Sequence, residues 1–443
     1  MNTPIYDYLI KYAQSGTLRL HMPGHKGKVR DNVLSRLNAL DITEITGAGN
    51  LFEYEGIIAQ SEKNATELFS TAATYYMTQG STLGIQTMLA VMKYDGRQVI
   101  AVRNAHRAFL SACVLLGIDV DWVFPVYSDS IISGAIDLRD VEESLKKHKR
   151  SCLYVTSPDY FGVMADIKSL AQLCHRYDCK LIVDNAHGAC LAFYEENRHP
   201  VHLGADICCD SAHKMFPAFT GAAYLHFADR KYAQGAKEIM TLFASTSPSY
   251  LITCSLDLCN VFLNDEIRQR LMQRTIWINA LRESLEDRYC FEAHDGEPLH
   301  LTVNAKKSGI DGMMLAGMLR ENNIEYEYAD NTHIIMLFSP CDEYEDFLRL
   351  GQVLEKIKFE KQSFESERIS FPVPEKVMSI RDAAFSKQSD METENSLGRI
   401  CAAVNVPCPP AIPVAVSGER ISEKCIEVMK YYGINKIRVV DER

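Results

Sequence analysis

The sequence has no apolar run long enough to cross a membrane, because charged residues interrupt each apolar stretch before the roughly 20 residues that a bilayer requires. The first residues lack a basic start followed by an apolar stretch, so we expect no signal peptide and a cytoplasmic location. The net charge of −11 provides no basic surplus for phosphates, which argues against nucleic acid as a partner. Internal repeats are also absent. The composition, 47% hydrophobic and 24% charged, is typical of a globular protein.

The 14 cysteines form no CxxC pair, and several lie in apolar runs, such as Cys208 and Cys209 in ADICCD. We therefore expect reduced cysteines that pack in the core of a protein from a reducing compartment. His199 and His202 form an HPVH run with no third ligand at a metal spacing. This run predicts a loop and no metal site.

Short β-branched runs alternate with helical patterns between about residues 66 and 230. Ile167, Leu170, Ala171 and Cys174 follow the i, i+3, i+4, i+7 spacing of an amphipathic helix. This alternation predicts an α/β fold with a mostly parallel sheet, in which ligands bind beyond the carboxyl ends of the strands. The predicted strands are 98–103, 152–157, 180–186, 206–211 and 222–227.

The pattern changes after Asp257, which predicts further domains. We expect an N-terminal arm (1–65), a large domain (66–257), a small α+β domain (258–360) and a C-terminal α+β unit (361–443). A charged, proline-bearing segment marks the last boundary, and a rigid PCPPAIP turn follows within the last unit. The small domain is predicted to contain a long helix (258–288), strands at 299–303, 324–329 and 333–338, and helices at 311–322 and 342–357.

Lys214 directly follows a predicted strand, among small and apolar residues in SAHKMFPAFTG. A buried lysine is costly unless it is paired, neutral or used covalently. Burial would favour the free amine, which is the form that bonds to a carbonyl carbon. The alternative is an ordinary surface lysine.

Asp184 ends the predicted strand LIVD, where an isolated charge would also be costly. Such a carboxylate can hold a protonated pyridine nitrogen, whereas the alternative is a cap of the following helix. His187 follows three residues later and would lie beside the same ring.

Gly80, Ser81 and Thr82 precede a helical pattern, and a glycine with two hydroxyls at a helix N-terminus suits a phosphate. A simple helix cap is the alternative. His106 follows the strand QVIAV and could stack on a flat ring, or it could be a structural residue. Together with Asp184 and Lys214, these residues fit one cofactor, pyridoxal 5'-phosphate.

In this order the residues resemble the bacterial ornithine/lysine/arginine decarboxylases, which are fold-type-I pyridoxal-phosphate enzymes. The chain resembles the short, Gram-positive type of member from near its first residue to its last. The matching segments are LHMPGHKG (20–27), DITEITG (41–47), QGSTLG (79–84), VRNAHRA (102–108), VDNAHGA (183–189), SAHKMFPAFTGAAYLH (211–226), STSPSYL (245–251), SIRDAAF (379–385) and CPPAIPVAVSGE (408–419).

The resemblance implies that Lys214 holds the cofactor as an imine, with His213 near the phosphate or the reacting carboxylate. It implies that Asp184 binds the pyridine nitrogen, that His106 stacks on the ring and that His187 flanks it. The phosphate would be bound by Gly80, Ser81, Thr82 and Ser211. Ser245 or Thr246 would act in the partner subunit's phosphate site, so the resemblance implies an active homodimer or a higher homo-oligomer.

The chain departs from the family pattern at several positions that we expect around the substrate pocket. The usual DEAHGAH is DNAHGAC here, so Asn185 and Cys190 replace a glutamate and a histidine. The usual HKS is His106-Arg107-Ala108, and the usual GLDDLH runs from Gly47 to Phe52 without its carboxylates and histidine. YPPGIP and PGE appear as CPPAIP (408–413) and SGE (417–419). The residues expected to bind the cofactor are retained, and the sequence does not identify the substrate.

The resemblance implies decarboxylation of an amino acid, most readily arginine, lysine or ornithine, to the amine and CO2. Lys214 or His213 would return the proton, and the sequence does not decide between them. One alternative is an aminotransferase or another lyase, for which Arg103 or Arg107 would have to bind the substrate carboxylate. The other alternative is a catalytically silent paralogue.

Overall fold

The computed structural model describes residues 1–28, 32, 34–127, 130–292, 295–363, 371–403 and 413–441. Most of the predicted PCPPAIP turn and part of the charged segment before the last unit lie outside these ranges. The chain divides into two compact units, Met1–Val91 with Ile182–Met272, and Met92–Leu181 with Gln273–Arg443. We call them unit 1 and unit 2.

The largest sheet has seven strands in the order β1-β9-β8-β7-β6-β2-β3. β7 and β8 are parallel, and β2 is parallel to both β6 and β3, whereas β9 is antiparallel to β8 and β1. The mostly parallel α/β sheet predicted from the sequence is therefore confirmed. The strands are β1 (Ala73–Met77), β2 (Gln98–Val102), β3 (Val120–Val123), β6 (Ser151–Thr156), β7 (Lys180–Asp184), β8 (Ile207–Asp210) and β9 (Ala223–Phe227).

The helices that alternate with these strands begin at polar caps and bury an apolar stripe. In α6 (Ile167–Arg176), Asp166 caps the first turn, and the predicted stripe from Ile167 to Cys174 is buried. The same pattern holds in α4 (Arg107–Leu116), capped by His106, and in α5 (Leu138–Lys147), capped by Asp137. Two short strands, β4 (Val126–Tyr127) and β5 (Gly134–Ala135), pair between β3 and α5.

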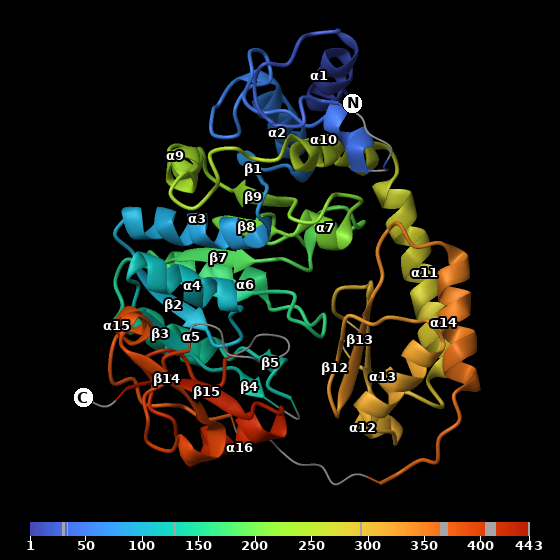
Figure 1. Cartoon of the computed structure of the whole chain (residues 1–443). Helices are drawn as coiled ribbons and strands as arrows, with labels where there is room; N and C mark the ends of the chain where they lie inside the picture. Colours follow the sequence, from blue (N-terminus) through green and yellow to red (C-terminus); the bar gives the residue numbers. More distant parts are fainter. Residues whose placement is uncertain are drawn as a thin grey trace. The chain divides into compact units, whose positions relative to one another are not determined.

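In unit 1, three helices lie together (Figure 1): α1 (Pro4–Gln14), α2 (Gly56–Phe69) and α10 (Tyr250–Asp265). Asp257 of α10 is fully buried and accepts the backbone N–H groups of Ile5 and Tyr6 at 2.9 and 3.0 Å. A carboxylate at the start of a helix satisfies amides that have no partner within the helix. Asp257 therefore fixes α1 to the body of unit 1. Shorter elements of unit 1 are η1 (Leu34–Ala39), η2 (Ala189–Ala192), α7 (Ala212–Met215), α8 (Arg230–Ala233) and α9 (Ala236–Met240).

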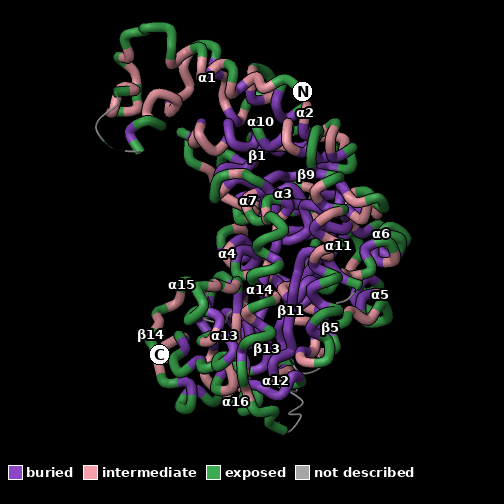
Figure 2. The backbone as a smooth tube through the Cα atoms, turned by 90° about the vertical axis from the view of Figure 1, so that its right-hand side faces the viewer, coloured by how far each residue is buried: buried purple, intermediate pink, exposed green. Residues whose placement is uncertain are grey.

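Unit 2 contains a second, four-stranded antiparallel sheet in the order β10-β11-β13-β12. Its strands are β10 (Cys290–Phe291), β11 (His300–Asn304), β12 (Tyr328–Ala329) and β13 (His333–Leu337), and β11 and β13 are buried in Figure 2. The accompanying helices are α12 (Ala305–Ser308), α13 (Gly312–Glu321) and α14 (Tyr344–Lys356). The predicted long helix is two helices, α10 and α11 (Ile267–Leu285), because the chain leaves helical geometry at Glu266.

The last part of unit 2 contains α15 (Ile380–Phe385), α16 (Glu423–Tyr431) and an antiparallel pair, β14 (Gln388–Glu392) and β15 (Lys436–Val440), with η3 (Thr393–Asn395). Its apolar residues share a core with Ile131 and Phe161. Glu419 of the SGE segment binds Arg103 through two hydrogen bonds of 2.9 and 2.7 Å, and both side chains are buried. Among the described residues, no helix has the length and apolarity that a membrane span needs.

Candidate active site

Two parallel strands, β7 and β8, end side by side at the predicted site. β7 ends at Asp184, which lies opposite Cys209 of β8, and β8 ends one residue later. The backbone N–H of Asn185 donates to the carbonyl of Cys209 at 2.9 Å, so the two loops that follow start in contact. The sequence predicted Asp184 at the end of one strand and Lys214 just after another, at the edge where α/β sheets bind ligands.

Lys214 lies in α7, a helix of four residues that begins two residues after β8. Its Nζ is 2.9 Å from Nε2 of His187, which joins the two loops. The prediction that Lys214 is buried is wrong for the single chain, because the residue is exposed. Ala212 and Met215 of the same helix are buried, whereas Lys214 is exposed.

Asp184 is only 2% exposed, as expected for a carboxylate at the end of a buried strand. Its Oδ1 accepts the backbone N–H of Ala186 at 3.2 Å, and the thiol of Cys209 lies 3.9 Å from the same oxygen. Asp184 thus stabilises the turn that leads to His187. A charge in this position has little water around it, which strengthens its interaction with a bound cation.

His213 precedes Lys214 in the same four-residue helix and contacts Ala222, the residue before strand β9. Its Nδ1 is 2.8 Å from the carbonyl of Ala222, a distance at which a protonated Nδ1 donates to that oxygen. Burial lowers the pKa of His213, and the charge of Lys214 lowers it further, against the effect of the Ala222 bond. Neutral His213 therefore carries its lone pair on Nε2, which suits a proton acceptor or a hydrogen-bond acceptor.

The predicted phosphate loop starts a long helix, α3 (Gly80–Tyr94). Gly80 has a φ of +69°, and a Cβ added there would lie 3.9 Å from Cε1 of His213, so the loop adjoins the Lys214 segment. Ser211 is fully buried, and its Oγ has no hydrogen-bond partner among the described residues. An unpaired buried hydroxyl beside a helix N-terminus is suited to an anion such as a phosphate. Ser81 is partly exposed and Thr82 exposed at the same helix start.

His106 belongs to unit 2 and caps α4, with Nδ1 accepting the backbone N–H of Ala108 at 3.2 Å. It is partly exposed, so the structural role and a ring-stacking role both agree with its geometry. Arg103 does not suit the role of a carboxylate clamp, because Glu419 already engages its guanidinium in the interior. Arg107 is exposed in the first turn of α4.

Ser245 and Thr246 are exposed in the turn before α10. The Oγ of Ser245 accepts the backbone N–H of Ser247 at 3.2 Å, which shapes the turn.

Two of the departures from the family pattern do not face a pocket. Asn185 and Cys190 are fully buried, the first beside Asp210 and the second with its thiol 3.9 Å from the carbonyl of Met215. The expectation that these two replacements border the substrate pocket is therefore wrong, because both side chains point into the protein.

A buried polar cluster surrounds Asp210, and the sequence pattern did not predict it. His199 and His226 both contact Oδ2 of Asp210, at 3.1 and 3.2 Å, and Cys208 lies 3.5 Å from Oδ1. His199 lies in a loop, as predicted, but it is buried. Cys208 and Asp210 alternate on one face of β8, and His226 lies opposite Cys208 in β9, which is the period-2 signal that could have revealed the cluster. His199, Cys208 and Asp210 also offer atoms within 4.8 Å of one another, but the carboxylate already accepts their hydrogen bonds.

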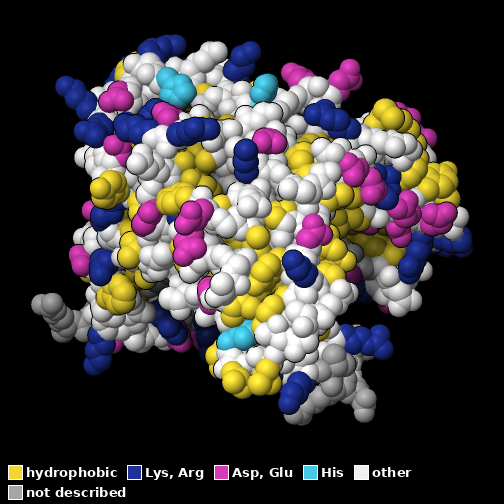
Figure 3. Space-filling view, turned by 90° about the horizontal axis from the view of Figure 1, so that it is seen from above, with side chains coloured by type: hydrophobic (Ala, Val, Ile, Leu, Met, Phe, Trp, Pro, Cys, Tyr) yellow, Lys and Arg dark blue, Asp and Glu magenta, His cyan; other side chains and the backbone are white. Residues whose placement is uncertain are grey.

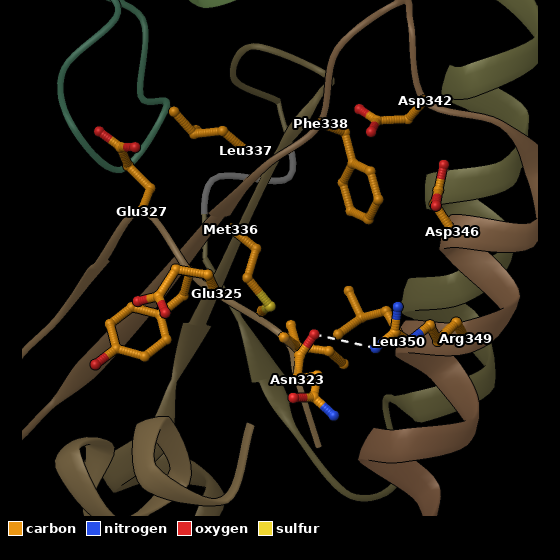
Figure 4. A pocket seen from close by; sticks show the side chains of 12 residues that line it. Asn323, Glu325, Glu327, Met336, Leu337, Phe338, Asp342, Asp346, Arg349 and Leu350 are labelled. Carbon is orange, nitrogen blue, oxygen red and sulfur yellow. Dashed lines mark hydrogen bonds between the residues drawn. The ribbon is translucent and has the colours of Figure 1, made fainter. Parts of the chain in front are cut away.

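A pocket of about 370 Å³ lies in unit 2 (Figure 4), lined by Asn323, Ile324, Glu325, Tyr326, Glu327, Met336, Leu337, Phe338, Asp342, Asp346, Arg349 and Leu350. None of the predicted site residues lines it. Its one guanidinium, that of Arg349, donates to the carbonyls of Asn322 and Asn323. We assign no catalytic role to this pocket.

Comparisons with known proteins identify the family of the chain. Residues 3–294 match the family described as Orn/Lys/Arg decarboxylase, major domain. The arginine decarboxylase of Bacillus subtilis (strain 168) is 30% identical over 451 residues, which cover 96% of this chain and 92% of that protein. The constitutive lysine decarboxylase of Escherichia coli (strain K12) is 19% identical over 97% of this chain and 76% of that protein.

Solved structures show the same fold. The lysine decarboxylase of Francisella novicida has a TM-score of 0.80 at 18% identity, with 99% of this chain and 81% of that chain covered. Lysine decarboxylase A of Pseudomonas aeruginosa has a TM-score of 0.81 at 18% identity, with coverage of 97% and 76%. The predicted fold class is therefore confirmed. The chain belongs to the Orn/Lys/Arg decarboxylase family of amino-acid decarboxylases.

Proposed function

We propose that this chain is a pyridoxal-phosphate-dependent decarboxylase of a basic amino acid, with arginine first, then lysine and ornithine. The observation that carries the proposal is the meeting of Lys214, Asp184 and Ser211 at the ends of two adjacent parallel strands. A nucleophilic amine, a buried carboxylate and an unpaired buried hydroxyl are the groups that hold the aldehyde, the ring nitrogen and the phosphate of this cofactor.

In this proposal, Lys214 holds the cofactor covalently through Nζ, and Asp184 keeps the pyridine nitrogen protonated. Ser211, Ser81, Thr82 and the first amides of α3 hold the phosphate, with Gly80 allowing close approach. His187 orients Lys214, and His106 covers the ring. When bound, the cofactor supplies a ring that accepts the electron pair left behind when CO2 departs.

The chain's own groups handle the proton. His213 has a lowered pKa and is neutral near pH 7, so its Nε2 is a poor acid in the resting enzyme. Lys214 is the better candidate for the donor, because its Nζ is held at 2.9 Å from Nε2 of His187. We therefore assign the return of the proton to Lys214.

The proposed substrate is based on the names of the matched proteins. Several matched proteins are named arginine decarboxylase, and others are lysine decarboxylases. The loss of the family's glutamate at Asn185 does not count against a basic substrate, because that side chain points into the core. An aminotransferase is less well supported, since Arg103, one of its two candidate clamps, is already paired.

We also propose a homodimer in the cytoplasm, within which Ser245 or Thr246 reaches the phosphate of the partner's site. Both are exposed in one chain. The N-terminal arm exposes Leu18, Leu20 and Met22 by 62% to 83%, and Figure 3 shows exposed hydrophobic side chains between charged ones on one face. Such surface is suited to burial in an interface.

We also propose that the domain boundaries of the chain lie at residues 65, 257 and 360.

The test is covalent attachment of the cofactor. Purified protein is mixed with pyridoxal phosphate, reduced with borohydride and digested, and the modified peptide is identified by mass spectrometry. The proposal predicts a visible absorbance band and a reduced adduct on Lys214, and neither in Lys214→Ala. An adduct spread over exposed lysines, with the same band in Lys214→Ala, would refute it.

A further inference from the structure

A buried carboxylate joins the two loops that carry the proposed cofactor residues. Nδ2 of Asn185 lies 2.8 Å from Oδ1 of Asp210, and both side chains are fully buried. Asn185 directly follows Asp184 in the first loop. Asp210 directly precedes Ser211, and Lys214 follows three residues later in the second loop. This one hydrogen bond therefore connects the segments that hold the ring nitrogen, the phosphate and the aldehyde.

The other oxygen of Asp210 is held by two histidines. Nε2 of His199 and Nε2 of His226 contact Oδ2 at 3.1 and 3.2 Å. The hydroxyl of Thr74 lies 2.9 Å from Nδ1 of His226, and that pairing agrees with a protonated Nε2 that donates to Asp210. His199, His226 and Asp210 are all fully buried. The two oxygens of Asp210 thus have different partners: Oδ2 accepts hydrogen bonds from the two histidines, and Oδ1 faces Asn185.

These donors keep Asp210 ionised. Burial opposes its charge, but His199 and His226 hold the pKa of the carboxyl well below its usual range. Burial lowers the pKa of His226, so that ring is a neutral donor near pH 7. Asp210 is therefore a fixed negative charge beneath the two loops, and a buried ionised carboxylate requires N–H partners.

The charge of Asp210 explains the residue at position 185. A carboxylate has no proton to give, so only the amide nitrogen of Asn185 can face it favourably. The family's usual glutamate there would bring a second carboxylate into the same buried space, where two like charges cannot both stay ionised. Asn185 is thus matched to Asp210 inside the protein.

We infer that Asn185 and Asp210 form a positioning pair that sets the relative placement of the Asp184 loop and the Lys214 loop for the cofactor, an inference that rests on the proposed function. Neither residue touches the reacting atoms. The pair acts through Asp184 and His187 on one side and through Ser211 and Lys214 on the other. The replacement of glutamate by Asn185 is a compensation for Asp210 and carries no information about the substrate.

The experiment compares N185D, D210N and the swapped double variant N185D/D210N with wild type. N185D is nearly isosteric and places two carboxylates against each other. In the double variant the introduced carboxylate faces the introduced amide nitrogen, while the amide oxygen still accepts from both histidines. Two quantities are measured: the thermal midpoint without cofactor, and the dissociation constant of pyridoxal phosphate from the visible band, with the pH at which that band changes.

Asn304→Asp is the matched control. Asn304 is 1% exposed, and its Nδ2 donates to Oε1 of Glu292 at 2.8 Å, so the substitution also places two carboxylates against each other, within unit 2. Glu292 is partly exposed and pairs with Lys307, so this control has the milder clash. The inference predicts that both N185D and Asn304→Asp lower the thermal midpoint. It predicts that only N185D weakens cofactor binding, by roughly tenfold or more, and that the swap restores binding to within roughly threefold of wild type. The pH midpoint of the band should shift in N185D and return in the double variant.

The outcomes separate the two proposals. If wild type shows no band that requires Lys214, the proposed function fails. If wild type binds the cofactor and N185D binds it as tightly as Asn304→Asp does, the positioning pair is refuted. If N185D does not fold, recovery of folding and binding in the double variant supports the pair. If the double variant also fails to fold, the affinity of D210N for pyridoxal phosphate is compared with that of wild type. An unchanged affinity refutes the positioning pair. A weaker affinity that Asn304→Asp does not show supports it.

Discussion

Nζ of Lys214 lies 2.9 Å from Nε2 of His187, although the two residues come from different loops after different strands. The contact joins the residue that we propose to hold the cofactor to the loop that begins at Asp184. It depends on the parallel pairing of β7 with β8, which ends both strands at the same edge. Lys214 is exposed in one chain, and in the proposed dimer the cofactor and the partner subunit would complete its environment.

Asp184→Asn tests the role of the buried carboxylate. The amide cannot keep a pyridine nitrogen protonated, so we expect kcat to fall by on the order of 100-fold or more, about 3 kcal/mol of transition-state stabilisation. The visible band of the attached cofactor should persist, because Lys214 is unchanged. The measurement is steady-state CO2 release together with an absorbance spectrum. A kcat within twofold of wild type would assign Asp184 to the turn alone.

Mixed dimers test the proposed shared site. Lys214→Ala and a Ser245→Ala/Thr246→Ala variant are each expected to be nearly inactive. Half of the dimers in a random mixture are hybrids, and one of the two sites in each hybrid is intact, so about one quarter of wild-type activity should return. As a control, Lys214→Ala mixed with Asp184→Asn should recover nothing, because both defects lie in the same chain's site. No recovery in the first mixture would place Ser245 and Thr246 outside the partner's site.

Glu419→Gln tests whether Arg103 is structural. The substitution leaves a buried, charged guanidinium without its partner, which we expect to cost about 3–5 kcal/mol in the free energy of unfolding. Glu375→Gln removes the exposed partner of Arg420 and should cost less than about 1 kcal/mol. Chemical denaturation of both variants gives the comparison. Equal midpoints would mean that the Arg103–Glu419 pair contributes little to stability.

Asp159 predicts a pH dependence of stability. It is 5% exposed, and burial raises the pKa of its carboxyl to about 6, against the hydrogen bonds from Ser133, Val163 and Phe161. The folded protein then binds more protons than the unfolded chain between about pH 4 and 6. This carboxyl therefore makes stability fall as pH rises through that window, by about 3 kcal/mol.

Asp159→Asn should remove this fall, because the amide oxygen can accept the same backbone hydrogen bonds without becoming charged. Denaturation profiles at pH 4 to 7 give the measurement. Asp311→Asn exchanges one good helix cap for another at α13 and should keep the wild-type profile. A profile for Asp159→Asn that parallels wild type would show that the carboxyl titrates normally.

The strands and their order along the chain could be predicted, because buried strands give continuous apolar runs and amphipathic helices give the 3.6-residue period. Asp184 could be placed for the same reason, since it ends such a run. The sequence pattern could not show that Lys214 is exposed, because exposure depends on a four-residue helix whose direction is set by tertiary contacts.

The hydrogen-bond partners of Asp210 also could not be predicted from the sequence pattern. His199 lies 11 residues before it and His226 lies 16 residues after it, and only the pairing of β8 with β9 and the path of the intervening loop bring them together. The sequence also does not show which side chains surround Asn185, and for this reason Asn185 was wrongly predicted to lie beside the substrate pocket. The break between α10 and α11 has a related cause, because the polar residues around Glu266 fit a helix and its end equally well.

The most direct test of the central claim is turnover of a panel of amino acids by the cofactor-loaded protein, with products identified by mass spectrometry. We predict that arginine, lysine or ornithine loses the mass of CO2, that the matching amine accumulates, and that Lys214→Ala gives no product. Conversion to a keto acid, or no turnover of any amino acid by a protein that carries the cofactor on Lys214, would contradict a decarboxylase.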